Sequence, residues 1–119
     1  MEKLDARTYK FALQIIRLVS ALPRTTTADV LGRQVLRSGT SIGANVEEAF
    51  ASSTRREFSH TLTIALKEAR ETHYWLRLIK DAGLVPIGQI DPLIQEAFEI
   101  KQILGKSIIT SKKPVASTR

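Results

Sequence analysis

The chain has 119 residues, 43% of them hydrophobic and 25% charged, a composition typical of one soluble globular domain with its own core. It has no cysteine, which excludes disulfide bonds and thiolate metal sites, and its apolar runs are far shorter than the about 20 residues of a membrane-spanning helix. The net charge of +6 favours an anionic partner, of which nucleic acid is the commonest.

The first predicted helix runs from Leu4 to about Leu22. It ends before Pro23, because proline disfavours the helical conformation in the residue that precedes it. The residues before this helix include an early acid and no apolar segment, which argues against a signal peptide. We therefore expect a cytoplasmic protein.

The second predicted helix begins after Thr27, a favourable N-cap, and extends to about Ser52. It contains Gly39 and Gly43, each of which destabilises a helix by about 1 kcal/mol relative to alanine. The helix therefore needs tertiary contacts, and we expect the two glycines to let another backbone come close. A break near Gly39 is the alternative to a continuous helix.

Start and stop signals delimit the third and fourth predicted helices. Thr54–Glu57 is a capping box that opens the third helix, and Gly83, suited to a left-handed conformation, ends it. Residues 84–90 are predicted to form a loop. Asp91 and Pro92 then supply an N-cap and a first-turn proline for the fourth helix.

In all four helices, apolar residues recur at steps of three and four, the spacing of one buried face. Four such helices with short connections predict an all-α fold, an antiparallel up-down-up-down four-helix bundle over residues 1–110. Residues 111–119 are predicted to form a flexible basic tail. The predicted core comprises Leu4, Phe11, Ile15, Leu18, Val19, Leu22, Leu31, Val35, Ile42, Val46, Ala49, Phe58, Leu62, Ala65, Ala69, Leu76, Ile79, Leu93, Ala97, Ile100, Leu104 and Ile108.

A row of polar residues accompanies the apolar seam of the second helix. This polar row consists of Gln34, Arg37, Ser41, Asn45 and Glu48, which lie on one side of the helix. We favour a structural polar network, in which Arg37 neutralises Glu48 or an acid of a neighbouring helix. A nucleic-acid or active-site surface is the alternative, although no histidine base accompanies Ser41 in the segment.

Basic residues gather on two helix faces, where clustered cations would suit a phosphate backbone. The alternative is a solvated face with local pairs, such as Lys67 with Glu71. The candidate nucleic-acid-binding residues are Lys3, Arg7, Lys10 and Arg17 on the first helix and Arg55, Arg70 and Arg77 on the third. Two more cations of the third helix, Arg56 and Lys67, lie nearby. The acids Glu57, Glu68 and Glu71 lie on the opposite flank of that helix.

Two further patterns on the third helix carry weaker signals. Tyr74 and Trp75 could stack on bases, but packing against a helix or another subunit is the interpretation that we favour. Glu57-x-x-His60 has the spacing of half a di-iron site, but the second copy is missing because Arg70 stands three residues before His73. We therefore expect no metal, no cofactor and no catalytic residues.

The pattern of the second helix resembles the signature of a family of bacterial four-helix bundle proteins, named after intervening sequences in 23S rRNA genes. Family members are similar to the accessory variability determinant protein of diversity-generating retroelements, a basic homopentameric ring that binds nucleic acid and a reverse transcriptase. This chain has Ala49 where the family has glycine, so the second helix is expected to continue a turn further. The resemblance is carried by Leu31, Gln34, Arg37, Ser41, Ile42, Asn45, Val46 and Glu48, and then by Phe58, Leu62, Ala65, Glu71 and Leu76.

The resemblance implies a homo-oligomer, pentameric by analogy, whose partners are RNA or DNA and a reverse transcriptase or other protein. Together with the basic faces, it favours a non-enzymatic accessory protein that binds the phosphate backbone of nucleic acid. The alternative is a homo-oligomeric scaffold whose partner is another protein.

Overall fold

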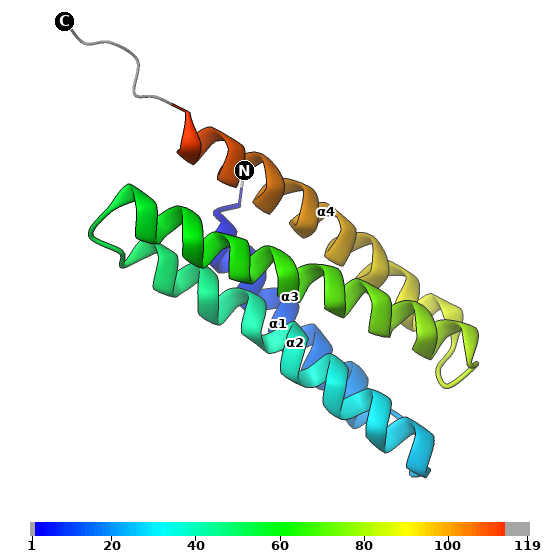
Figure 1. The fold of residues 1–119 in the computed structure, drawn as a ribbon. Helices are drawn as coiled ribbons and strands as arrows, with labels where there is room; N and C mark the ends of the chain where they lie inside the picture. The colour runs from blue at the N-terminus through cyan, green and yellow to red at the C-terminus, as the bar shows by residue number, and fades with distance from the viewer. Residues whose placement is uncertain (1, 114–119) are drawn as a thin grey trace, which may run out of the picture.

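The structure is a computed structural model that describes residues 2–113, and these residues form four helices joined by short loops (Figure 1). The helices are α1 (Leu4–Ser20), α2 (Thr26–Phe50), α3 (Arg55–Asp81) and α4 (Ile87–Lys112), and residues 2–113 contain no strand. Each helix packs against its neighbour in the chain, and α1 also packs against α4, whereas α1 and α3 lie on a diagonal without contact. The predicted all-α four-helix bundle is confirmed.

The connection between α1 and α2 differs from the prediction. α1 ends at Ser20, and the N-cap of α2 is Thr25, so the prediction of Thr27 as N-cap was wrong. The Thr25 hydroxyl oxygen accepts a hydrogen bond of 3.1 Å from the Ala28 backbone N–H. With this cap, Ala28 lies in the first turn of α2, where it is buried.

α2 continues through both of its central glycines without a break, which excludes the alternative of an interruption near Gly39. A Cβ atom on Gly39 would lie 2.9 Å from Cγ1 of Ile15, so only glycine leaves room for α1 there. The expected close approach of another backbone is confirmed at Gly43, where a Cβ atom would lie 3.3 Å from the Thr8 carbonyl carbon, whereas the close neighbour of Gly39 is the Ile15 side chain. α2 ends at Phe50, two residues before the predicted end.

Both ends of α3 agree with the local sequence signals. The Thr54 hydroxyl oxygen accepts from the Glu57 backbone N–H at 3.1 Å, and the same hydroxyl contacts the Glu57 carboxylate at 3.0 Å. At the other end, Gly83 has a φ of +70°. The Leu84 N–H donates to the Ile79 carbonyl at 3.2 Å, which closes the helix with a Schellman motif.

The predicted start of α4 was wrong. The helix begins at Ile87 after Pro86, four residues before the predicted N-cap Asp91, and Pro92 lies inside it. Tertiary packing explains the difference, because the early start brings Ile90 into the core, where it is completely buried. The Asp91 carboxylate instead pairs with the Lys80 ammonium at 2.7 Å.

α4 ends at Lys112, two residues beyond the predicted end, so Ser111 and Lys112 are helical rather than part of a tail. The rest of the predicted tail, from residue 114 onward, lies outside the described residues.

The core agrees with the predicted apolar faces, except that Leu4, Val19, Leu22, Leu31 and Phe58 are only partly buried. Polar side chains that the apolar pattern did not mark also lie inside. The hydroxyl oxygens of Thr72 and Ser38 lie 2.8 Å apart in a hydrogen bond between α3 and α2. The Thr8 hydroxyl donates to the Leu4 carbonyl at 2.9 Å within α1.

Candidate nucleic-acid interface

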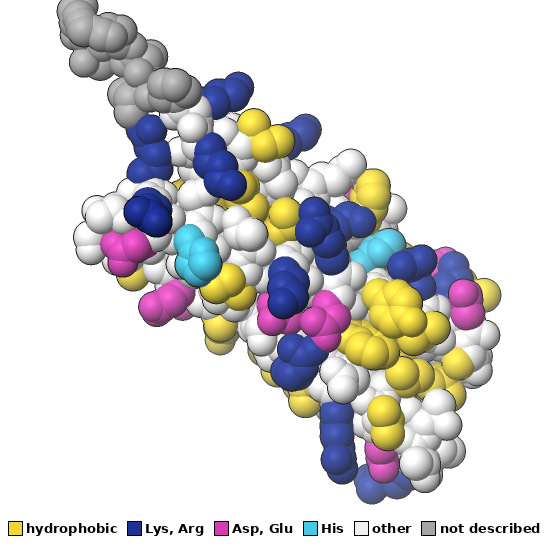
Figure 2. Space-filling model, in the orientation of Figure 1, with side chains coloured by type: hydrophobic (Ala, Val, Ile, Leu, Met, Phe, Trp, Pro, Cys, Tyr) yellow, Lys and Arg dark blue, Asp and Glu magenta, His cyan; other side chains and the backbone are white. Residues whose placement is uncertain are grey.

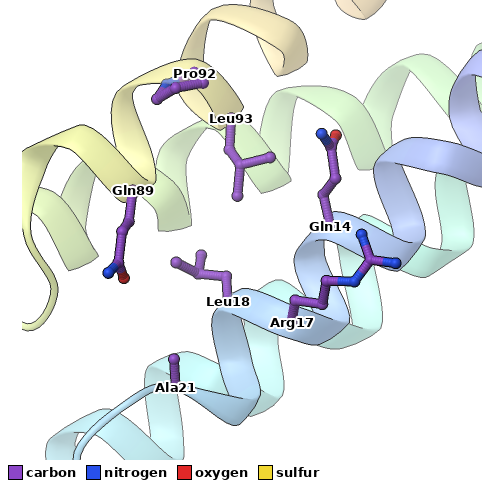
Figure 3. A pocket seen from close by; sticks show the side chains of 7 residues that line it. All are labelled: Gln14, Arg17, Leu18, Ala21, Gln89, Pro92 and Leu93. Atoms are coloured by element: carbon purple, nitrogen blue, oxygen red, sulfur yellow. The ribbon is translucent and has the colours of Figure 1, made fainter.

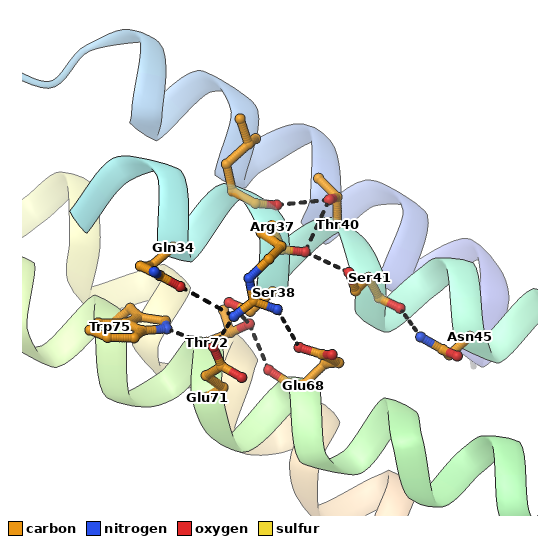
Figure 4. Close-up of polar contacts among 11 residues, drawn as sticks. Gln34, Arg37, Ser38, Thr40, Ser41, Asn45, Glu68, Glu71, Thr72 and Trp75 are labelled. Carbon is orange, nitrogen blue, oxygen red and sulfur yellow. Dashed lines mark hydrogen bonds and ion pairs between the residues drawn. The ribbon is translucent and has the colours of Figure 1, made fainter. Parts of the chain in front are cut away.

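The first part of the polar row joins α2 to α3 (Figure 4). The Arg37 guanidinium pairs with the carboxylates of Glu68, at 3.3 Å, and Glu71. The Glu71 carboxylate also accepts from the Trp75 indole N–H at 3.2 Å, and Gln34 accepts from Arg37 at 3.3 Å. Arg37 is thus neutralised by acids of a neighbouring helix, one of the two partnerships considered from the sequence.

The second part of the polar row makes contacts only within α2. The Ser41 hydroxyl donates to the Arg37 carbonyl at 2.6 Å, and the Asn45 amide donates to the Ser41 carbonyl at 2.8 Å (Figure 4). The Glu48 carboxylate is exposed and has no hydrogen-bond partner within residues 2–113. The five residues of the row therefore do not form one continuous network.

Two of the four candidate cations of α1 are engaged by acids. The Arg7 guanidinium bridges the carboxylates of Glu96, at 2.6 Å, and Glu99, at 2.7 Å. The hydrogen bonds that Arg7 donates to these two carboxylates of α4 raise the pKa of Arg7. The Lys10 ammonium pairs with the Glu2 carboxylate at 3.0 Å. Arg7 is therefore a structural link between α1 and α4, which leaves Lys3 and Arg17 without an ion pair within the described chain.

The candidate cations of α1 and α3 lie on helices that are not in contact with each other, because α1 and α3 occupy diagonal corners of the bundle. Cations of α3 are instead joined by lysines of α4, and Figure 2 shows Lys and Arg side chains gathered over these two helices. We call this surface the α3–α4 basic face and define it by Arg55, Arg56, Arg70, Arg77, Lys101 and Lys112, all drawn from these two helices.

His73 marks the middle of the α3–α4 basic face. Its ring packs against the Phe98 ring of α4, with centroids 6.2 Å apart. Burial lowers the pKa of His73, and the positive charges of Lys101 and Arg77 lower it further. Two cations, Lys101 and Arg77, therefore act on His73 where α3 meets the middle of α4.

Sequence reasoning missed the lysines of α4. A signal was present: Glu99 is the last acid of α4, and every charged residue from there to the end of the helix is lysine. The predicted start of the tail also removed Lys112 from the helix. With α3 beside α4, Lys101 and Lys112 extend the face that Arg55, Arg70 and Arg77 begin.

The neighbouring aromatic residues Tyr74 and Trp75 have different environments. Their rings meet edge to face with centroids 5.2 Å apart. Trp75 is partly buried and packs against the core, as the favoured interpretation expects. Tyr74 is 48% exposed, and the Arg77 guanidinium lies 5.8 Å from its ring centroid, so a cation–π pair lies at the edge of the basic face.

A small cavity of about 280 Å³ opens between α1 and the beginning of α4 (Figure 3). Leu18 and Leu93 line it, and Arg17 contributes its single cation. With one cation, this cavity is poorly suited to phosphate. A second cavity of about 620 Å³ lies at the other end of α4 and is lined by three cations, Arg55, Arg56 and Lys112.

No group of three or more His, Cys, Asp or Glu side chains that could hold a metal ion is found in residues 2–113, including around Glu57 and His60. None of the four helices combines the length and hydrophobicity that crossing a membrane requires.

Comparisons with known proteins agree on one family. The model of the family described as 23S rRNA-intervening sequence protein matches residues 3–106. A crystal structure of a protein of unknown function from the S23 ribosomal protein family of Bacteroides thetaiotaomicron is 37% identical. The match covers 89% of this chain and 98% of that chain with a TM-score of 0.83. No curated protein matches.

Proposed function

The chain belongs to the 23S rRNA-intervening sequence protein family, and we propose that it is a non-enzymatic accessory protein that binds nucleic acid on the α3–α4 basic face. The observation that carries the proposal is the segregation of charge on α3 and α4. Beyond Glu99, α4 presents only lysines as charged residues, and two of them, Lys101 and Lys112, lie near arginines of α3. Phosphate contacts require clustered cations rather than a shaped pocket, and such a face supplies them.

The chemistry of this face favours the phosphate backbone over base edges. Its cations lie on helix surfaces, and two exposed aromatic side chains, Tyr74 and Phe98, lie beside Arg77 and Lys101. Stacking of bases on aromatic rings tolerates any sequence, so we expect weak sequence preference. The family name and the resemblance to the accessory variability determinant protein support RNA or DNA as the ligand, and the ribosome-related name supports a cytoplasmic location.

Replacing cations of this face should weaken binding and flatten its salt dependence. The variant Arg70→Gln/Arg77→Gln/Lys101→Gln removes three charges from the face. Each phosphate contact that is lost should lower the slope of log K against log[salt] by about 1. The matched control, Lys3→Gln/Lys10→Gln/Arg17→Gln, removes three charges from α1, on the diagonal corner.

Fluorescence anisotropy with a mixed-sequence oligonucleotide, measured between low and moderate salt, distinguishes the two variants. The proposal predicts weaker binding with a smaller salt slope for the α3–α4 variant and native behaviour for the control. Native binding by the α3–α4 variant would place the nucleic-acid surface elsewhere, and loss in the control alone would place it on α1.

A homo-oligomeric scaffold is the second candidate function, and a stripe of exposed apolar residues favours it. Tyr9, Leu13 and Ile16 recur at steps of four and three on α1 and are 61%, 38% and 43% exposed. An apolar stripe on a protein surface is typical of a contact with another chain. By the resemblance, this contact would build a pentamer, and a reverse transcriptase or other protein would be the further partner.

A further inference from the structure

We propose that the groove between the start of α3 and the end of α4 binds the terminal phosphate of a nucleic-acid strand. The inference rests on the proposed function and refines it, because it separates the recognition of a strand end from the general attraction of the α3–α4 basic face. The ligand class is a phosphomonoester on a terminal nucleotide.

The size and lining of the groove suit such a group. Its volume is about 620 Å³, within the range of about 300–1,000 Å³ of small-molecule sites. The lining residues combine cations and hydroxyls and include no acid. They are Arg55, Arg56, Ser59, His60, Thr63, Ser111 and Lys112.

An unpartnered hydroxyl provides independent support for a ligand. Ser59 is 6% exposed, and its Oγ is the one buried side-chain oxygen or nitrogen in residues 2–113 that lacks a hydrogen-bond partner. The nearby hydroxyls of Thr63 and Ser111 both donate to backbone carbonyls at 2.8 Å. Because buried polar groups in native proteins are nearly always hydrogen-bonded, the Ser59 hydroxyl calls for an acceptor in the groove.

The cations are arranged to receive more than one negative charge. The Arg55 guanidinium donates to the Lys113 carbonyl at 3.0 Å, which ties the end of α4 to the start of α3. A guanidinium has five N–H donors, so the remaining donors of Arg55 are available to a ligand. Arg55 and Arg56 also occupy the first turn of α3, where the helix dipole favours an anion.

The charge of the groove favours a strand end over an internal phosphate. Arg55, Arg56 and Lys112 place three positive charges around a space of about one nucleotide. A phosphodiester carries one negative charge, whereas a phosphomonoester carries nearly two at neutral pH. A terminal phosphate therefore matches the groove better than an internal phosphate does.

The test compares two oligonucleotides of identical sequence, one with a 5′-phosphate and one with a 5′-hydroxyl. The native protein should bind the phosphorylated strand about tenfold more tightly, because charge-assisted hydrogen bonds are added. Ser59→Ala should reduce this ratio toward 1 and preserve binding of the 5′-hydroxyl strand. Arg56→Gln should also reduce the ratio, and it should weaken binding of both strands because it removes a cation of the α3–α4 basic face. The control Arg70→Gln should lower the affinity for both strands by a similar factor and leave the ratio of the two affinities unchanged.

A nucleoside monophosphate and inorganic phosphate serve as further probes, followed by NMR shifts of the Ser59 and Thr63 amides. Amide shifts that appear with the nucleotide but not with inorganic phosphate would support binding of a terminal nucleotide. Equal amide shifts with both probes would show that the groove binds free phosphate, which would overturn the strand-end proposal. If neither oligonucleotide binds, the proposed function fails. The nucleotide titration then shows on its own whether the groove binds a nucleotide phosphate. Equal affinity for the two strands together with silent amides overturns the inference and leaves the function of the face intact.

Discussion

Gly43 of α2 lies directly against the backbone of Thr8 in α1. A Cβ atom on Gly43 would lie 3.3 Å from both the carbonyl carbon and the carbonyl oxygen of Thr8. Backbone atoms cannot rotate away as a side chain can, so the contact fixes how closely the two helices approach. The Thr8 hydroxyl oxygen would lie 3.2 Å from the same Cβ atom. It donates a hydrogen bond within α1, which holds it in place against Gly43.

Substitution of Gly43 by alanine should therefore destabilise the protein. Alanine is the better helix former by about 1 kcal/mol, but overpacking against a fixed backbone costs about 1–3 kcal/mol, so we expect a net loss. Gly105→Ala is the matched control, because a Cβ there meets nothing within 4 Å, and it should stabilise α4 by up to about 1 kcal/mol. Urea unfolding of both variants measures the difference, and a stabilised Gly43→Ala variant would contradict a tight contact.

The sequence predicted those helix ends that local chemistry determines. The Thr54 cap and the left-handed Gly83 are complete within a few residues, and both were identified. The start of α4 was predicted from Asp91 and Pro92, whereas the helix begins after Pro86, where the burial of Ile90 by other helices favours the earlier start. Local signals cannot resolve such a choice, because tertiary packing makes it.

The site was less predictable than the fold for a related reason. Helical periodicity places Arg7 and Arg70 on faces of their own helices, but it does not say which helices become neighbours. Arg7 meets Glu96, 89 residues away, which removes a cation from the candidate set. The position of α4 beside α3 adds Lys101, whose role depends entirely on that neighbour.

The bridge from Arg7 to α4 should contribute to stability in a pH-dependent way. Hydrogen bonds from Gln95 and Arg7 lower the pKa of Glu99 below its ordinary 4.5. A carboxyl group with a depressed folded-state pKa stabilises the fold above pH 4.5, and the stabilisation disappears as the pH falls through the folded-state value. The Arg7→Gln variant should therefore have a lower free energy of unfolding than the native protein at neutral pH. This free energy should also fall less than that of the native protein as the pH is lowered.

Lys10→Gln is the control for this prediction, because the Lys10–Glu2 pair is exposed and such pairs contribute about 0–1 kcal/mol. Thermal unfolding at pH 7 and in steps below pH 5 compares Arg7→Gln, Lys10→Gln and the native protein. Parallel pH profiles for all three would show that Arg7 does not influence the carboxylates of α4.

His73 should report directly on the potential of the α3–α4 basic face. Burial and the charges of Lys101 and Arg77 lower its pKa, so its NMR titration midpoint should lie below 6.5. The unfolded chain binds the proton at higher pH, so the free energy of unfolding should fall as the pH drops below 6.5 toward that midpoint. Bound phosphates would offset the two cations, and a saturating oligonucleotide should raise the midpoint.

Lys101→Gln separates the two contributions in the free protein. Removing this charge should raise the midpoint partway toward 6.5, because burial still favours the neutral imidazole. An oligonucleotide that binds without moving the native His73 midpoint would indicate contacts away from the middle of the α3–α4 basic face.

The apolar stripe on α1 should mediate assembly if the protein forms an oligomer. Leu13 lies between Tyr9 and Ile16 on this stripe, and all three are exposed in the single chain. Leu13→Glu introduces a charge whose burial in a contact would be costly, so the assembly should dissociate while each bundle remains folded. The control Ile109→Glu alters a residue that is 62% exposed on α4, away from the stripe, and should leave the assembly unchanged. Multi-angle light scattering measures the mass of the assembly, and circular dichroism measures the helical content of each variant. A native mass for Leu13→Glu would exclude the stripe as the subunit contact, whereas loss in both variants would show a general effect of added charge.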